Sequence, residues 1–146
     1  MDIIIKSYNR PYYLHRCLQS IKENVLGNYK VIIVDDGTPQ KYLDKISSLY
    51  AIEIFKTENY EKKSFNIEND LINDGFNIPT ESWRKAVENA SDYFLITEDD
   101  VWFTKEINCD ELVNAMKLHN IHLTKLGILG IYSDDNYSEV LSLSNE

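Results

Sequence analysis

Two clusters of carboxylates stand directly behind apolar, strand-like runs of this chain. They are the triplet Glu98–Asp100, which follows residues 93–97, and the pair Asp35–Asp36, which follows residues 31–34. Carboxylates crowded at the end of a buried strand repel one another, so a cation or a polyphosphate assembly is expected to compensate them. Two strands that end in this way predict one shared site.

The composition limits the class of protein. The chain has 146 residues, which is the size of one ordinary domain. Its formal net charge of -9 argues against a nucleic acid as the main partner, because that binding relies on clusters of Lys and Arg. Two cysteines without close spacing indicate reduced thiols, and no apolar run is long enough for a membrane span. We therefore expect a soluble, cytoplasmic protein.

Apolar patterns of strand type and helix type alternate along the chain and predict an α/β fold. The expected class is a single domain over residues 1–146, Rossmann-like, with a mostly parallel central sheet flanked by helices. Gly27 is expected to end the first helix, and residues 56–78 show no sustained period and are interpreted as a long loop. The expected strands are 3–6, 30–34, 52–55, 93–97 and 126–132, and the expected helices begin at Pro11, Thr38, Thr80 and Asp110.

In a parallel sheet the ligand lies at the carboxyl ends of the strands, and three segments are expected there. These are residues 7–10, 35–38 and 98–100. Together they offer an aromatic ring, polar side chains for a base or a sugar, and carboxylates for hydroxyl groups and a divalent cation. This combination predicts a pocket for a nucleoside diphosphate.

The order and spacing of these segments resemble the family 2 glycosyltransferases of the GT-A fold. The resemblance covers roughly the first 105 residues. It implies a GT-A-type domain that moves a sugar from a UDP- or GDP-linked donor to an unknown acceptor, with Mn²⁺ or Mg²⁺ as the cofactor. The residues that carry it are Ile4–Arg10, Val31–Thr38, Ala86–Val87, Ala90–Tyr93 and Glu98–Asp100.

The resemblance also implies roles for individual residues. Asp36 would accept a hydrogen bond from a ring N–H of the base, and Asp100 would ligate the metal that bridges the diphosphate. Arg84 stands where the family commonly has Asn, so it is either a phosphate contact or a solvated side chain. The expected nucleotide-sugar-binding residues are Ser7, Tyr8, Asn9, Arg10, Asp35, Asp36, Arg84, Glu98 and Asp99.

The general base is the part of the expected site that the sequence does not supply. In the family this carboxylate lies well beyond the acidic triplet, whereas this sequence ends at Glu146. Asp134 and Asp135 are the paired acids of that region and are the candidates for the base. The alternative function is therefore a non-catalytic or incomplete nucleotide-sugar-binding domain that lacks part of the acceptor platform.

Plainer interpretations of the same residues stay open. Residues 35–37 also fit ordinary turn chemistry after a strand, and residues 98–100 also fit a solvated acidic helix cap. A phosphoacceptor receiver domain likewise places acids at strand ends, but in this chain the acidic pair follows the second strand instead of the first. A nucleotidyltransferase is disfavoured because residues 7–10 are not a Gly-rich loop.

Overall fold

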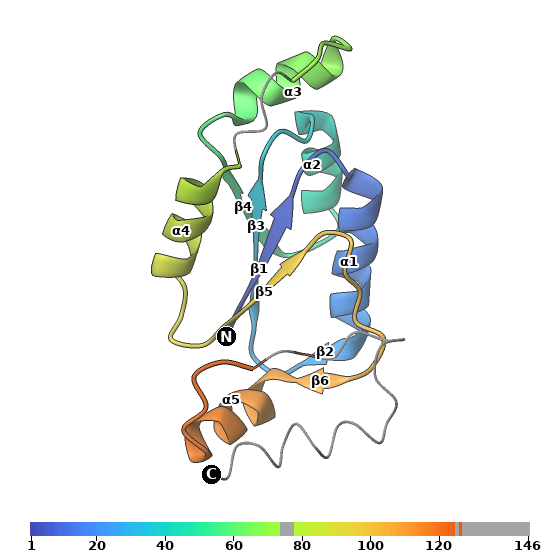
Figure 1. Cartoon of the computed structure of the whole chain (residues 1–146). Coiled ribbons are helices and arrows are strands. Elements are labelled where there is room, and N and C mark those ends of the chain that lie inside the picture. Colours follow the sequence, from blue (N-terminus) through green and yellow to red (C-terminus); the bar gives the residue numbers. More distant parts are fainter. Residues whose placement is uncertain (74–77, 125, 127–146) are drawn as a thin grey trace. The chain divides into compact units, whose positions relative to one another are not determined.

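Four parallel strands form the central sheet, in the order β4-β3-β1-β5 (Figure 1), in a computed structural model that describes residues 1–73, 78–124 and 126. Ser7 lies opposite Asp35 in the register of β1 and β3, and Lys6 lies opposite Glu98 in that of β1 and β5. The carboxyl ends of these strands therefore meet at one edge. The strands are β1 Asp2–Ser7, β3 Lys30–Asp35, β4 Ile52–Lys56 and β5 Phe94–Glu98, and a separate two-stranded parallel sheet pairs β2 Val25–Leu26 with β6 Ile107–Asn108.

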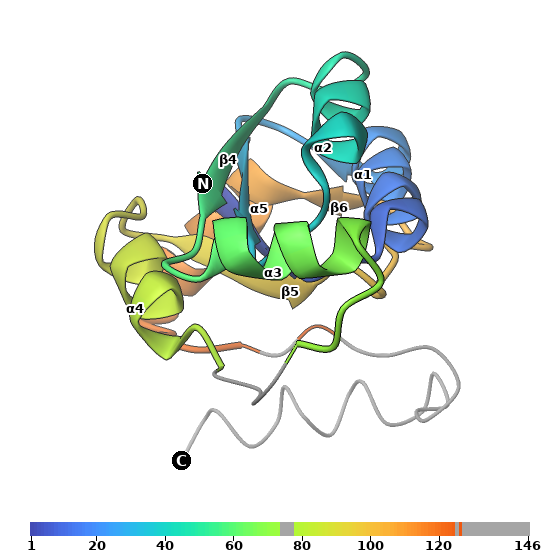
Figure 2. The ribbon, with the colours of Figure 1, turned by 90° about the horizontal axis from the view of Figure 1, so that it is seen from above.

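In the part of the chain that the structure describes, five helices accompany the sheets, and three of them cover the two faces of the central sheet (Figure 2). Ile3 and Ile5 pack with the apolar side chains of α1 and with Ile46 of α2. Ile4 points to the opposite face, where it packs with side chains of α4 such as Val87. This alternation along a strand whose centre is buried on both sides is what a two-sided parallel sheet requires. The helices are α1 Pro11–Asn24, α2 Gln40–Ser47, α3 Tyr60–Glu68, α4 Thr80–Glu88 and α5 Cys109–Leu118. The predicted α/β class is thereby confirmed.

The structure departs from the sequence prediction in several described places, one of which is the unexpected two-stranded sheet of β2 and β6. Residues 60–68, which we expected to be part of a loop, form α3 beyond the carboxyl ends of β3 and β4 (Figure 1). Gly27 does not end the first helix, because α1 ends at Asn24 and β2 comes between them. Gly27 has a φ of +90°, a conformation that glycine adopts without strain, in the turn after β2. The predicted strand 126–132 lies outside the described residues except for Leu126, which is in no strand.

Contacts divide the chain into two units, Met1–Ala115 and Met116–Glu146. The central sheet and the three predicted site segments all belong to the first unit. Of the second unit the structure describes residues 116–124 and 126, which complete α5 and a turn where the Ile121 N–H donates to the Met116 carbonyl oxygen. None of the helices in the described ranges is long and apolar enough to cross a membrane.

Candidate functional site

The three predicted segments meet at the carboxyl edge of the sheet, and backbone groups tie them together. The Asp36 N–H donates to the Ser7 carbonyl oxygen at 2.9 Å, and the Asn9 N–H donates to Thr38 Oγ1 at 3.0 Å. The Tyr8 N–H points to Asp99 Oδ2 at 3.4 Å. Asn9 has a φ of +46°, a left-handed conformation that asparagine tolerates better than most residues. The expected grouping of residues 7–10, 35–38 and 98–100 is therefore present.

Asp35 organises the loop that follows β3. Its carboxylate is fully buried and accepts hydrogen bonds from the Gly37 N–H at 3.0 Å, the Thr38 N–H at 2.7 Å and Thr38 Oγ1 at 2.6 Å. Burial raises the pKa of Asp35, and these hydrogen bonds oppose the rise. Gly37 has a φ of +137°, and a Cβ there would lie 2.7 Å from Lys63 Cβ, so the loop requires glycine at this position.

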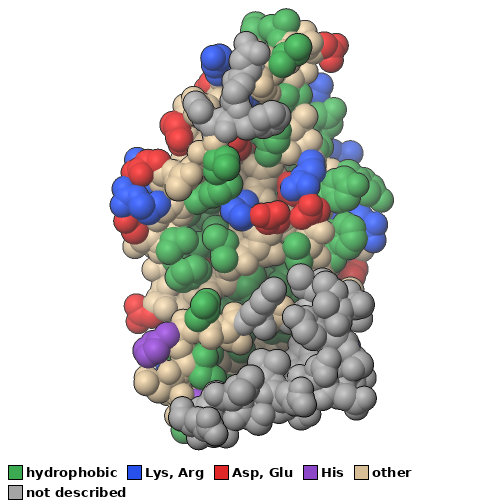
Figure 3. All heavy atoms as spheres, viewed as in Figure 1, with side chains coloured by type: hydrophobic (Ala, Val, Ile, Leu, Met, Phe, Trp, Pro, Cys, Tyr) green, Lys and Arg blue, Asp and Glu red, His purple; other side chains and the backbone are tan. Residues whose placement is uncertain are grey.

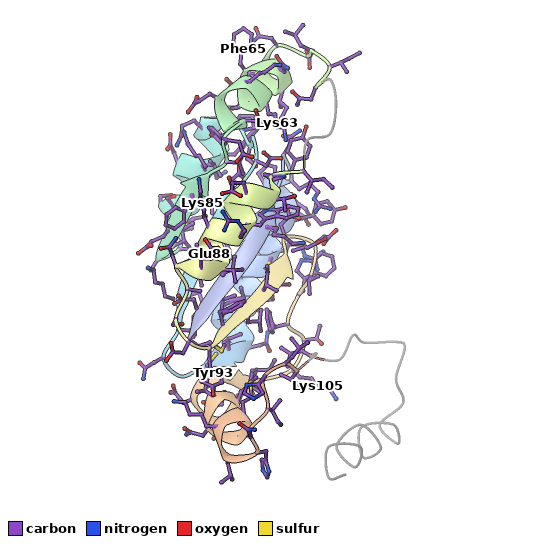
Figure 4. All side chains as sticks on the ribbon, turned by 60° about the vertical axis from the view of Figure 1, so that its left-hand side comes forward. Lys63, Phe65, Lys85, Glu88, Tyr93 and Lys105 are labelled. Carbon is purple, nitrogen blue, oxygen red and sulfur yellow. The ribbon has the colours of Figure 1, made fainter. Side chains whose placement is uncertain are left out.

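Asp36 turns in the other direction and is held by two side chains from the following segments. Thr57 Oγ1 donates to its Oδ1 at 2.5 Å, and Lys63 Nζ lies 2.5 Å from its Oδ2. Lys63 comes from α3 (Figure 4) and also lies over the Tyr8 ring, 5.5 Å from its centre. Asp36, Lys63 and Tyr8 thus lie together where a base was expected.

Arg10 joins the acidic triplet to the first loop. Its Nη2 lies 2.5 Å from Asp99 Oδ1 and its Nη1 lies 2.7 Å from Asp100 Oδ2, so one guanidinium serves two carboxylates. The Asp99 side chain is 0% exposed and that of Asp100 is 38% exposed. Burial raises the pKa of Asp99, and the charge of Arg10 acts in the opposite direction. Arg10 is therefore the charge that compensates a buried carboxylate.

The remaining members of the predicted set lie in more ordinary surroundings. Glu98 forms an exposed pair with Lys6 at 2.7 Å, and acidic and basic side chains gather side by side over the end of β5 (Figure 3). Arg84 forms ion pairs with Glu81 and Glu88 of its own helix, so its bonds are those of a solvated helix face. The candidate bases Asp134 and Asp135 lie outside the described residues.

The buried Ser7 hydroxyl lies beneath the two acidic clusters. It makes no hydrogen bond of ordinary geometry, yet it is close enough to Asp35 and Asp99 to lower the pKa of both. Cys17 also lies below this edge, with its Sγ 3.9 Å from the Glu98 carbonyl oxygen. Burial, with the charges of Asp99 and Asp100, raises the pKa of Cys17 to about 12, so this thiol is inert at neutral pH.

Two groups of residues near the site were missed from the sequence. Thr57 and Lys63 belong to the stretch that showed no period. The available signal was the aromatic Tyr60 within this mainly polar stretch, which in the structure is buried and donates its hydroxyl to the Thr38 carbonyl oxygen at 2.7 Å. The second group is Tyr13 and Arg16, which join Trp102 in an exposed cluster beside the site. The Tyr13 and Trp102 rings are parallel, with centres 6.2 Å apart, and Arg16 lies over Trp102.

The described residues supply only part of a metal site. Among them no group of three or more His, Cys, Asp or Glu side chains is placed to hold an ion. Asp99 is buried and paired with Arg10, whereas Asp100 is partly exposed at the rim. Asp100 therefore fits as a single carboxylate ligand for a cation whose other ligands come from a bound molecule, as is usual for Mg²⁺ with phosphates.

Comparison with known proteins gives the fold and the family. The solved structure described as "Crystal structure of S. aureus TarS" superposes with a TM-score of 0.57 at 16% identity, over 82% of this chain and 20% of that one. "Crystal structure of S. aureus TarS 1-349" gives a TM-score of 0.52 at 17% identity, over 82% of this chain and 32% of that one. The chain thus spans less than a third of the length of either neighbour. No curated protein matches it.

At this level of identity the structural neighbours show the fold alone, and that fold is GT-A, as predicted. The family rests on a separate finding, because the family model described as "Glycosyl transferase family 2" matches residues 2–143, nearly the whole sequence. This match gives no support to the receiver and nucleotidyltransferase alternatives. The chain belongs to glycosyl transferase family 2.

Proposed function

We propose that this chain forms the donor site of a glycosyltransferase, which binds a UDP- or GDP-linked sugar and moves the sugar to an acceptor. One observation supports this above all: the loops after β1, β3 and β5 meet at one edge and bring together Tyr8, the nearly buried Asp36 and the partly exposed Asp100. Family membership gives the reaction class. The ligand site of an open α/β sheet is expected at this edge.

The parts of the donor are assigned by chemistry. The base lies beside Tyr8 and Asp36, where an aromatic face and a carboxylate acceptor lie together with the ammonium of Lys63. The diphosphate lies toward Arg10 and Asp100, since Arg10 is the nearest guanidinium to the partly exposed acid. Ser7, Asn9, Asp35 and Asp99 act mainly by holding the loops in place.

Mn²⁺ or Mg²⁺ would be held by Asp100 together with oxygens of the donor diphosphate. When bound, such an ion neutralises the negative charge that develops on the leaving nucleoside diphosphate. The protein groups do the remaining work: Asp36 orients the base, Arg10 holds charge close to the phosphates, and Asp99 keeps Arg10 in place. The general base is assigned to no described residue.

Calorimetric titration with UDP, GDP and their sugar conjugates, with Mn²⁺ and then with a chelator, tests this proposal. We expect one nucleotide to bind, more tightly with Mn²⁺ than with chelator. Asp100→Asn is expected to remove the metal dependence, and Asp36→Asn to weaken binding of the bare nucleoside monophosphate. No binding of any nucleotide would refute the donor site.

A transfer assay separates the enzyme from the alternative, a nucleotide-sugar-binding domain without catalysis. Release of the nucleoside diphosphate from the bound donor, in the presence of a panel of saccharide acceptors, would indicate transfer or hydrolysis. Donor binding without any release would favour the non-catalytic domain. The control is Asp100→Asn, which we expect to lower release together with metal-dependent binding.

A further inference from the structure

We propose that Arg10 forms an ion pair with Asp100 when no donor is bound. When the donor diphosphate binds, Arg10 releases this carboxylate, which then ligates a divalent cation. The proposal rests on the proposed function and adds a regulation of the same site. It is drawn from one juxtaposition, in which the two outer nitrogens of a single guanidinium hold two carboxylates of unequal exposure.

The two contacts of Arg10 are not equivalent. The Nη2 contact, 2.5 Å long, goes to Asp99 Oδ1, which is wholly enclosed; it is an ion pair without the geometry of an ordinary hydrogen bond. The Nη1 contact, 2.7 Å long, goes to Asp100 at the rim, where water competes for both partners. Because an uncompensated buried carboxylate is costly, the contact with Asp99 is the one that is retained. The contact with Asp100 is the one that is free to exchange.

A divalent cation and the guanidinium compete for the same carboxylate. Arg10 Nη1 lies at hydrogen-bond distance from Asp100 Oδ2, so a divalent cation held by that carboxylate would lie close to the positive charge of the guanidinium. The two cations would repel each other strongly in a partly enclosed site. Asp100 is therefore a poor metal ligand as long as Arg10 remains on it.

The donor diphosphate relieves this competition. A guanidinium pairs with a phosphate as readily as with a carboxylate. Because its fork is rigid and planar, Nη1 moves when the whole group pivots about the contact between Nη2 and Asp99. With Nη2 still on Asp99, Nη1 moves from Asp100 to a phosphate oxygen. Asp100 and the diphosphate then offer oxygens to one cation together. Metal and nucleotide should consequently bind with positive coupling, and each should raise the affinity of the other by the same factor.

The experiment measures Mn²⁺ affinity of the full chain by the electron paramagnetic resonance signal of free Mn²⁺, with and without UDP or GDP. In the unchanged protein Mn²⁺ alone should bind weakly. In Arg10→Gln we expect Mn²⁺ alone to bind about tenfold more tightly, because the competing charge is gone. Metal-free nucleotide should bind about tenfold more weakly to the same variant, because a phosphate contact is lost.

Three further variants keep the test decisive. Lys30→Gln removes one positive charge of an exposed pair with Glu53 at the opposite end of the sheet, and should leave Mn²⁺ affinity unchanged. Arg10→Lys keeps the charge compensation for Asp99 but lacks the fork, so it serves if Arg10→Gln fails to fold, and should give a smaller gain. Adding Asp100→Asn to either Arg10 variant should abolish the gain, since it removes the ligand.

The possible results separate this proposal from the function on which it rests. Unchanged or weaker Mn²⁺ binding in folded Arg10 variants overturns the proposal, even if nucleotides bind normally. An equal gain in Lys30→Gln also overturns it, because the effect would then be one of net charge. If no nucleotide binds to the unchanged chain, the donor site itself is refuted. The proposed release of Asp100 from Arg10 is then refuted as well.

Discussion

The two acidic clusters resemble each other in sequence but are compensated in different ways. Asp35 is satisfied by the loop that it begins, through two backbone N–H groups and one hydroxyl within three residues. Asp99 and Asp100 both form ion pairs with Arg10, which is 90 residues from Asp100 in the chain. A carboxylate held by its own turn is a fixed part of the fold. A carboxylate held by one long side chain can exchange its partner.

The largest expected effect comes from Asp35→Ala. This change leaves three buried or enclosed donors without their acceptor, so we expect a loss of about 3 kcal/mol in the free energy of unfolding. Urea denaturation followed by far-UV circular dichroism measures it. Asp44→Ala is the matched control, since Asp44 lies on the exposed side of α2, where its carboxylate accepts from Gln40, and should cost less than about 0.5 kcal/mol. Equal losses would contradict the organising role of Asp35.

The second prediction concerns the unequal contacts of Arg10. A double-mutant cycle of Arg10→Gln with Asp99→Asn should give a coupling of about 2 kcal/mol, since one partner is fully enclosed. The same cycle with Asp100→Asn should give less than about 1 kcal/mol, since both partners are partly exposed. Urea denaturation of the six proteins provides both numbers. Equal couplings would mean that Arg10 does not distinguish the two acids.

The third prediction tests the side chains that hold Asp36. Thr57→Val removes the hydroxyl that donates to Asp36 Oδ1 and preserves the shape of a buried side chain, so we expect a loss of about 1 kcal/mol in stability. Thr104→Val, at an exposed position, is the control and should be nearly neutral. If Thr57→Val is equally neutral, Asp36 is held by Lys63 alone.

The sequence predicted the parts of this fold that depend on local patterns. The alternating strands and helices, and the grouping of residues 7–10, 35–38 and 98–100, follow from periodicity and from the geometry of parallel sheets. The bond between Arg10 and the acidic triplet did not follow, because nothing local links side chains so far apart in the chain. Arg10 was expected near the nucleotide, but its two partners were not foreseen.

The helix α3 shows a second limit of sequence reasoning. Its residues are mainly polar, and only Tyr60 and Ser64 are buried. The sequence therefore has no apolar stripe that would predict a helix. The helix nevertheless supplies Lys63 to Asp36. Polar segments near a ligand site have little core to bury, and their apolar periodicity is correspondingly weak. Lys63 was therefore missed, although it contacts Asp36 in the proposed site.

The smallest expected effect comes from Glu98→Gln, and it separates the three acids of the triplet. Glu98 is half-exposed and pairs with the partly exposed Lys6, so its removal should change the free energy of unfolding by less than about 0.5 kcal/mol. Raising the salt concentration should remove even that difference, because exposed pairs are screened. If Glu98→Gln nevertheless weakens binding of the nucleotide sugar and leaves that of the bare nucleotide unchanged, then Glu98 contacts the sugar. A loss of stability comparable to that of Asp99→Asn would instead place Glu98 among the groups that hold the strand end together. The exposed fraction of an acidic side chain would then not predict whether its partner is fixed or can be exchanged.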